Sequence, residues 1–237
     1  MDSFFCMSRV GRVWYNVDMN ELIAHVYEMK AEDRVFDFAS VFPVGAPLEL
    51  EIGCGNGRFL AANAAKHPER CYLGVERMME RLRRCSKKAQ QGALNNLAFV
   101  RVEAGRFVRE VVPDGSISAF YLFFPDPWPK RRHHKNRFFQ PEMCSVLARI
   151  LVPGGKVYIS TDHADYFGEM ARYLSADARF EAIEPLVRAE DEQTDFERLF
   201  LSKGEPIYNC AFQLRAESTV DSGESTARVP RQADSVP

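Results

Sequence analysis

The chain has 237 residues, of which 46% are hydrophobic and 27% charged, and its formal net charge at pH 7 is −2. This length and composition are those of one globular domain with a single core, and they exclude a fibrous or a wholly disordered protein. No run of about 18 apolar residues and no secretory segment is present, so we expect a cytoplasmic protein without a membrane partner.

In chain order, residues 1–46 form a leader that we expect to be partly ordered, with one weak helix at residues 20–29. Short apolar runs then alternate with amphipathic stretches from residue 47 to residue 215. This alternation predicts an α/β domain of Rossmann-like type, a mostly parallel sheet with helices on both faces. Residues 216–237 have almost no large apolar side chains and are expected to be a disordered tail. The expected strands are 48–52, 71–75, 97–102, 117–124, 156–160, 180–187 and 207–214, and the expected helices are 58–66, 77–91, 106–111, 141–151 and 164–175.

A glycine loop follows the first of these strands and opens the first helix. Gly53, Gly55 and Gly57 form a GxGxG pattern, a context in which the backbone approaches a bound cofactor closely. Arg58 stands where a dinucleotide-binding GxGxxG motif has its third glycine, which weakens a nicotinamide or flavin assignment. Glu51 places a negative charge just before the loop, and this charge suits a cation better than a phosphate.

Glutamates also close the next two strands. Glu76 ends the second strand, where a carboxylate can accept both hydroxyls of a ribose, and Glu103 follows the third. Each glutamate alone is equally typical of an exposed strand end. Because parallel strands end at a common edge, Glu51, Glu76 and Glu103 together predict a site for a ribosylated cation.

Residues 123–137, FFPDPWPKRRHHKNR, carry the most specific pattern of the chain. Three prolines stiffen the segment, and Asp126 beside Trp128 suits a planar, polar ring. The competing interpretations are a solvated surface turn and, for Trp128, a plug of the core. The nearby cations indicate a polyanion, and the expected RNA contacts are Lys130, Arg131, Arg132, Lys135 and Arg137. A second basic stripe, Arg77, Arg81, Arg84 and Lys88, runs along helix 77–91 beside an apolar stripe of Met78, Leu82, Cys85 and Ala89.

The spacing of the cysteines and histidines does not indicate a metal site. The six cysteines show no CxxC spacing and no ligand spacing to the five histidines, so we expect reduced thiols and no bound metal.

Taken together, the motifs resemble class I S-adenosylmethionine-dependent methyltransferases, and PDPWPKRRH narrows the resemblance to the tRNA (guanine-N7)-methyltransferase family. LEIGCGNG, YLGVE, FFPDPWPKRRH, STDH, TDFE and GEPIY carry it from about residue 46 to residue 212. The resemblance implies a seven-stranded sheet whose last strand is antiparallel. It also implies methyl transfer from S-adenosylmethionine, without a metal, to N7 of a guanine in the variable loop of tRNA.

Site residues follow from the resemblance by position. Glu103 stands where the family often has Asp, Asn136 interrupts a basic run that is usually continuous, and TDFE is also a capping box. The implied catalytic residue is Asp126. The implied donor-binding residues are Glu51, Gly53, Gly55, Gly57, Glu76, Glu103 and Asp126, and the implied substrate-binding residues are Lys130, Asp162, Thr194, Asp195, Phe196 and Glu197.

Three other functions use part of the same pattern. A nicotinamide-dependent oxidoreductase would share the glycine loop and Glu76 but leaves PDPWPKRRH unexplained. A catalytically decayed, RNA-binding methyltransferase fold would bind tRNA without transfer, and a DNA base methyltransferase would use a similar proline and tryptophan loop. The sequence is compatible with a monomer and with a homodimer.

Overall fold

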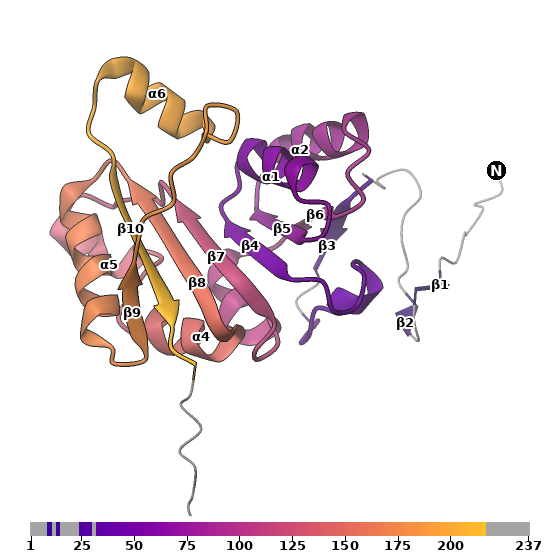
Figure 1. The fold of residues 1–237 in the computed structure, drawn as a ribbon, viewed down its shortest axis with the longest axis horizontal. Helices are drawn as coiled ribbons and strands as arrows, with labels where there is room; N and C mark the ends of the chain where they lie inside the picture. Colours follow the sequence, from indigo (N-terminus) through magenta and orange to yellow (C-terminus); the bar gives the residue numbers. More distant parts are fainter. Residues whose placement is uncertain (1–8, 11–12, 15–23, 30–31, 217–237) are drawn as a thin grey trace, which may run out of the picture.

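The computed structural model describes residues 9–10, 13–14, 24–29 and 32–216. Its centre is an eight-stranded sheet with the strand order β3-β6-β5-β4-β7-β8-β10-β9 (Figure 1). Strand β10 runs antiparallel to both of its neighbours, and the other pairings in this sheet are parallel. The strands are β3 (Val26–Glu28), β4 (Leu48–Ile52), β5 (Cys71–Glu76), β6 (Leu97–Arg101), β7 (Ile117–Phe123), β8 (Leu151–Thr161), β9 (Phe180–Ile183) and β10 (Tyr208–Leu214). A separate antiparallel pair joins β1 (Arg9–Val10) to β2 (Val13–Trp14).

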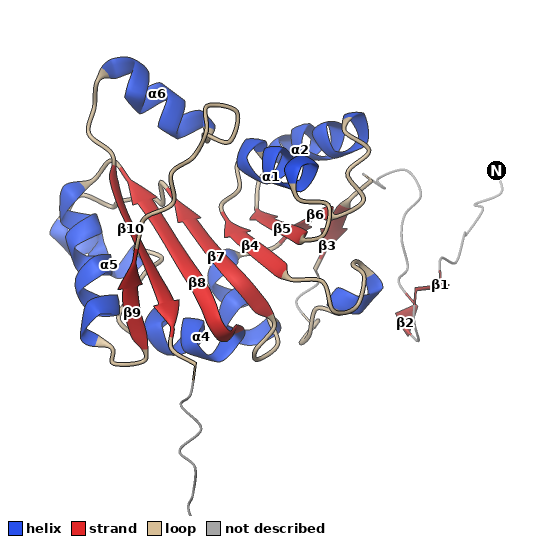
Figure 2. Ribbon diagram, in the orientation of Figure 1, coloured by secondary structure: helices blue, strands red, loops and turns tan. Residues whose placement is uncertain are grey.

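Helices cover both faces of the sheet (Figure 2). Helices α1 (Arg58–Lys66) and α2 (Met79–Gln91) pack on one face. The other face carries α4 (Met143–Ile150), α5 (Ala164–Ala176) and the turn made by α3 (Ala104–Arg106) and η2 (Phe107–Val111). Two 3-10 turns, η1 (Phe38–Ser40) and η3 (Arg131–Asn136), lie in loops. Helix α6 (Asp195–Lys203) stands above the sheet edge at which β7 and β8 end (Figure 1).

Strand β4 shows how one short sequence serves both faces. All five residues of its LELEI sequence are buried. Leu48, Leu50 and Ile52 enter the core under α4 and α5, so the alternation of a strand turns Glu49 and Glu51 to the other face. Glu49 is satisfied there, because it accepts hydrogen bonds from Arg70 at 2.6 Å and from the Tyr121 hydroxyl at 2.6 Å.

The expected α/β class, with a mostly parallel sheet and helices on both faces, is confirmed. The expected strands and helices from residue 47 onward are present, with ends that move by a few residues. Strand β8 starts five residues before the expected 156, and β9 ends at Ile183 instead of residue 187. No helix in the described part of the chain is long and apolar enough to cross a membrane.

The leader contributes a strand where a helix was expected. The predicted helix at residues 20–29 is wrong, since residues 26–28 form β3, parallel to β6, while residues 20–23 lie outside the described residues. The free edge of β6 offers unpaired backbone groups, and Val26 and Tyr27 are good strand formers. The sheet therefore has one strand more than the seven expected. The predicted disordered tail, residues 216–237, lies outside the described residues apart from residue 216.

Gly74 in β5 tests the packing between the sheet and α1. A Cβ atom at this position would lie 2.7 Å from Cys54 Sγ, 2.7 Å from Phe99 Cδ1 and 2.8 Å from Leu60 Cδ1. We expect Gly74→Ala to lower the free energy of unfolding by about 1–3 kcal/mol, measured by urea denaturation, because the core must shift to admit the methyl group.

The matched control is Gly168→Ala on α5, where a Cβ atom would meet nothing within 4 Å. It should raise the free energy of unfolding by about 0.5–1 kcal/mol, since alanine is the better helix former. Equal stabilities of the two variants would contradict this packing.

Candidate functional site

The glycine loop between β4 and α1 has a backbone that only glycine adopts readily. Gly53, Gly55 and Gly57 have φ angles of 71°, 57° and 66°, all in the left-handed region. The amides of Gly53 and Cys54 donate to the Val75 carbonyl at 2.8 and 3.0 Å, which ties the loop to the end of β5. These two hydrogen bonds thus fix the loop at the edge of the sheet, just before the first turn of α1.

A cleft of about 180 Å³ lies over this loop. Three of the four buried side-chain polar atoms that lack a hydrogen-bond partner in the described chain belong to residues that line it: Glu51 Oε2, Asn56 Oδ1 and Arg58 Nε. Leaving such groups unpaired is costly, so the cleft is suited to a polar ligand that donates to oxygens and accepts from a guanidinium. The lining residues are Glu51, Gly53, Cys54, Gly55, Asn56, Arg58, Phe59, Arg81, Phe123, Thr194, Asp195, Phe196 and Leu199.

Glu51 is the buried ionisable group at the floor of the cleft. It is 2% exposed, and burial raises the pKa of its carboxyl to about 8. The positive charge of Arg188 acts in the opposite direction and lowers this pKa, while the charge of Glu76 raises it further. A cation that enters the cleft would therefore stabilise the ionised form of Glu51.

Glu76 and Glu103 brace the turns that follow β5 and β6. Glu76 accepts from the amides of Arg77 at 2.7 Å and Met78 at 2.9 Å. The exposed Glu103 caps α3 by accepting from the amides of Gly105 and Arg106 at 2.8 and 2.7 Å. A carboxylate has four lone-pair sites, so both groups can still accept from a ligand. They lie along the rim, outside the set of residues that line the cleft.

The PDPWP loop, residues 125–129, leaves the end of β7 in a constrained conformation. Phe124 and Trp128 have positive φ angles of 50° and 42°, which bulky residues rarely adopt. The Phe124 amide donates to the Ser160 carbonyl at 2.7 Å, and Arg137 Nε donates to the Pro127 carbonyl at 2.8 Å. The loop thereby presents Asp126 to solvent, with no hydrogen bond to its carboxylate from any described residue.

Trp128 does not plug the core. Its side chain is 38% exposed, and its ring meets that of His133 edge-on, with 5.9 Å between centroids. The indole is therefore available to a planar ligand, and the core-plug alternative is wrong.

Arg137 anchors this loop and is not a surface cation, so the expected RNA contact at Arg137 is wrong. The residue is 2% exposed and lies with its guanidinium 4.8 Å from the centroid of the Tyr166 ring. It donates to Glu169 at 2.6 Å and to Asp165 at 2.9 Å, both on α5. The other expected contacts, Lys130, Arg131, Arg132 and Lys135, are exposed.

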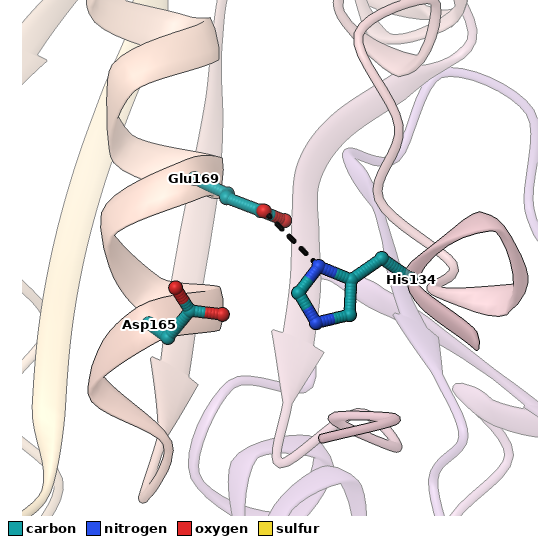
Figure 3. A group of neighbouring side chains, drawn as sticks. All are labelled: His134, Asp165 and Glu169. Carbon is teal, nitrogen blue, oxygen red and sulfur yellow. Dashed lines mark ion pairs between the residues drawn. The ribbon is translucent and has the colours of Figure 1, made fainter. Parts of the chain in front are cut away.

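His134, Asp165 and Glu169 form the cluster most like a metal site in the described chain (Figure 3). Their potential ligand atoms lie within 4.8 Å of one another, and His134 Nδ1 is 3.6 Å from Glu169 Oε1. Both carboxylates are already paired with Arg137, and this pairing lowers the pKa of Asp165. The cluster is thus engaged in fixing the loop.

Helix α6 brings the TDFE segment to the cleft. The Thr194 hydroxyl caps the helix by accepting from the Glu197 amide at 3.1 Å, and Asp195 accepts from Asn56 Nδ2 at 2.8 Å. Phe196 is 47% exposed. Glu197 is different, because it is buried and both of its oxygens accept from Arg188, at 2.6 and 2.9 Å.

The structure thus gathers some of the expected site residues and separates others. Glu51, Gly53, Gly55, Thr194, Asp195 and Phe196 line the cleft, whereas Gly57 does not. Lys130 and Asp162 lie on the loops after β7 and β8, beyond the residues that line it. Sequence reasoning missed Asn56, Phe123 and Arg188, for which no local signal exists. It noted Arg58 only as a departure from another motif.

The second basic stripe is partly engaged within the protein. Arg81 lies 3.3 Å from Glu76, Arg84 pairs with Glu80, and Lys88 donates to the Asn56 carbonyl at 2.8 Å. In the neighbouring apolar stripe Leu82, Cys85 and Ala89 are fully buried as expected. Met78 is 49% exposed, so its expected burial is wrong, because it precedes the first turn of α2.

Comparison with known proteins gives consistent results. A family model described as "Putative methyltransferase" matches residues 45–210. The tRNA (guanine-N(7)-)-methyltransferase of Halorhodospira halophila is 42% identical over 193 residues, which are 79% of this chain and 83% of that protein. The protein of the same name from Alkalilimnicola ehrlichii is 38% identical over 185 residues, 76% of this chain and 77% of the relative.

Among solved structures, the 16S rRNA methyltransferase KamB superposes with a TM-score of 0.57 at 15% identity and covers 89% of this chain and 100% of its own. This similarity shows a shared fold.

The burial of Glu51 predicts a pH dependence of stability. Its pKa of about 8 in the folded chain lies above the ordinary 4.5, so the stabilisation is complete below about pH 4.5 and is lost as the pH rises through 8. Relative to Glu51→Gln, the wild-type protein should lose up to about 1.4 kcal/mol of unfolding free energy per pH unit in that interval. Urea denaturation without ligand measures it, and a pH-independent difference would contradict the burial of the Glu51 carboxyl.

Proposed function

The chain belongs to the tRNA (guanine-N7)-methyltransferase family, and from this premise we infer that it transfers the methyl group of S-adenosylmethionine to N7 of a guanine in tRNA. One observation carries the assignment to this site: a buried carboxylate with an unpartnered oxygen, Glu51, lies beside a left-handed glycine loop. The neighbouring strand, β7, leads to an exposed carboxylate at Asp126.

The residues of the cleft fit the donor. S-adenosylmethionine carries a sulfonium and an ammonium group, which match the negative charge of Glu51, and a carboxylate, which matches the unpartnered Arg58 Nε. The glycines let the backbone approach the ligand, and Glu76 would accept from the ribose hydroxyls. A volume of about 180 Å³ is less than the roughly 300 Å³ of small ligand sites. Part of the donor would therefore lie along the rim towards Glu103.

The acceptor would lie on the side of Asp126. Exposed aromatic rings flank the approach, since Trp128 follows Asp126 in the loop and Phe196 lies against Phe124 with 6.3 Å between centroids. Stacking of a base on an aromatic ring is worth roughly 1–3 kcal/mol. Asp126 would accept from the donor groups on the edge of the guanine.

Methyl transfer places few demands on proton chemistry. Guanine N7 has a lone pair and no proton, so the N7–carbon bond forms as the carbon–sulfur bond breaks and its electron pair stays on sulfur. Alignment of the reactants can contribute about 7–11 kcal/mol. Positive charge moves from the sulfonium to the purine ring, and the Asp126 carboxylate would offset it as it develops.

The RNA would be held by the exposed cations after the PDPWP loop. We name residues 130–136 the basic loop; Lys130, Arg131, Arg132 and Lys135 carry its positive charge. Asp162 lies on the adjacent loop at the end of β8 and would contact the same substrate. We propose that the modified guanine lies in the variable loop of tRNA, as the family resemblance implies.

The direct test incubates the full chain with methyl-labelled S-adenosylmethionine and unmodified tRNA and identifies the labelled nucleoside. We expect 7-methylguanosine from tRNA and no label in duplex DNA. Binding of tRNA without transfer would instead support a catalytically decayed protein, and label in DNA would redirect the substrate assignment.

Asp126→Asn should reduce the transfer rate by at least about 100-fold while the affinity for S-adenosylmethionine stays within about twofold, because the carboxylate acts on charge that develops in the transition state. Single-turnover kinetics and calorimetry measure the two quantities.

The matched control is Asp114→Asn, at the opposite end of β7, where the carboxylate is exposed and paired with Arg149. It should leave both quantities unchanged. A wild-type rate of methyl transfer in Asp126→Asn would show that Asp126 is not a catalytic residue.

Salt dependence distinguishes the two basic regions. Replacing Arg131 and Arg132 with Gln should reduce the slope of log affinity for tRNA against log salt by about 0.7–0.9 for each phosphate that these cations neutralise in the wild type. Replacing Arg84 and Lys88, whose cations are bonded within the protein, should change the slope less. Titrations between 50 and 200 mM salt, roughly the range over which binding to phosphates weakens strongly, measure the slopes. A larger change of slope for the Arg84 and Lys88 variant than for the Arg131 and Arg132 variant would contradict this assignment.

A further inference from the structure

Arg188 lies in the loop between β9 and α6 and is 8% exposed. Its Nε and Nη2 atoms donate to the two oxygens of Glu197 at 2.6 and 2.9 Å, a bidentate pair. Nη2 also donates to the Ser160 hydroxyl at 2.9 Å, and the guanidinium lies 4.3 Å from the centroid of the Phe123 ring. One side chain therefore joins α6 to the ends of β7 and β8.

Stability alone does not explain this pair. Removing two charges from water is expensive, and well-packed apolar residues in place of a buried ion pair are often as stable or more stable. Glu197 also does not complete the capping box of α6. In a complete capping box the glutamate side chain accepts from the amide of the cap residue, here Thr194, whereas Glu197 is turned to Arg188.

The position of the pair points to the cleft. Phe123, under the guanidinium, lines the cleft, and so do Thr194 and Asp195 at the start of α6. The charge of Arg188 also acts on Glu51 at the cleft floor. The Arg188 guanidinium thus acts on Glu51 at the floor of the cleft and, through Glu197, on α6 at its roof.

We propose that Arg188 is a positioning residue for methyl transfer: it holds the first turn of α6 over the donor cleft through Glu197, and its positive charge favours the ionised form of Glu51. The inference rests on the proposed function, because it names what shapes the donor site of that reaction. Nothing else in the described chain links α6 to the sheet through a buried ion pair.

A consequence is that Arg188 sets the pH range of donor binding. A cationic donor binds best when Glu51 is ionised, and loss of Arg188 would raise the pKa of Glu51 further above 8. Each unit of that increase weakens binding about tenfold at pH 7. The charged or titratable groups around the cleft floor are Arg188 before α6, Glu76 at the end of β5, Cys54 in the glycine loop, Arg58 on α1, Arg81 on α2 and Asp195 on α6.

The experiment measures the dissociation constant of S-adenosylmethionine without tRNA, for the full chain, between pH 6.5 and 9. The variants are Arg188→Met, Arg188→Lys and the double variant Arg188→Met with Glu197→Met. The matched control is Arg198→Met on α6, whose guanidinium is 44% exposed and 3.9 Å from Glu190. The ratio of variant to wild-type constants at each pH cancels the titration of the ligand itself.

We expect Arg188→Met to bind the donor at least about tenfold more weakly at pH 7, with the ratio shrinking several-fold by pH 9 as Glu51 ionises. Arg188→Lys should recover part of the affinity, because it returns the charge without the bidentate geometry. The double variant leaves no unpaired charge at position 197, so it should regain stability in urea, while its affinity stays low because Glu51 still lacks the charge of Arg188. Arg198→Met should match the wild type.

Wild-type affinity in Arg188→Met, or full recovery of affinity in the double variant, would overturn the inference and leave the pair a staple of the fold. If Arg188→Met does not fold, the double variant decides alone. A wild-type protein that binds S-adenosylmethionine and forms 7-methylguanosine keeps the proposed function in either case. A wild-type protein that binds no donor would overturn both.

Discussion

A buried carboxylate with an unpartnered oxygen lies at the centre of the proposed functional edge of this protein. Strand β4 is buried along its whole length, and its alternation turns Glu51 towards the cleft beside the glycine loop. A charge in such a place is tolerated only when other groups compensate it. The compensating groups are the guanidinium of Arg188 within the chain and the positive charge of the proposed donor. The roof of the cleft, α6, is attached through the same guanidinium.

The second carboxylate of the proposed site has the opposite environment. Asp126 is exposed on a loop whose path is set by prolines, by two residues with positive φ and by the buried Arg137. Strands β4 and β7 are neighbours, so the buried and the exposed carboxylate share one edge of the sheet. This difference suits their proposed tasks. Glu51 would bind a cation that is present from the start, whereas Asp126 would respond to charge that develops on the purine during transfer.

Much of the fold was predictable because its signals are local. The apolar runs and the turn glycines depend on residues close in sequence, and the helix at Arg58–Lys66 was expected with the bounds it has. Strand β3 was not predictable, since it forms by pairing with β6, about 70 residues away along the chain. The edge position of Glu51, Glu76 and Glu103 followed from the rule that parallel strands end together.

The misjudged site residues share one physical cause. Arg137 sits in a basic run and Arg188 in a polar stretch, so composition assigns both to the surface. Their burial depends on partners elsewhere, Asp165 and Glu169 for Arg137 and Glu197 with Ser160 for Arg188. Trp128 was open to two interpretations because the positive φ of its backbone, which turns it outward, leaves no trace in the sequence.

The most direct test of the proposed site is a solved structure of the chain with S-adenosylhomocysteine. We expect the amino-acid end of the ligand between Glu51 and the first turn of α6, the ribose at Glu76, and the sulfur facing the side of Asp126. A ligand bound elsewhere, or a sulfur facing away from Asp126, would contradict it.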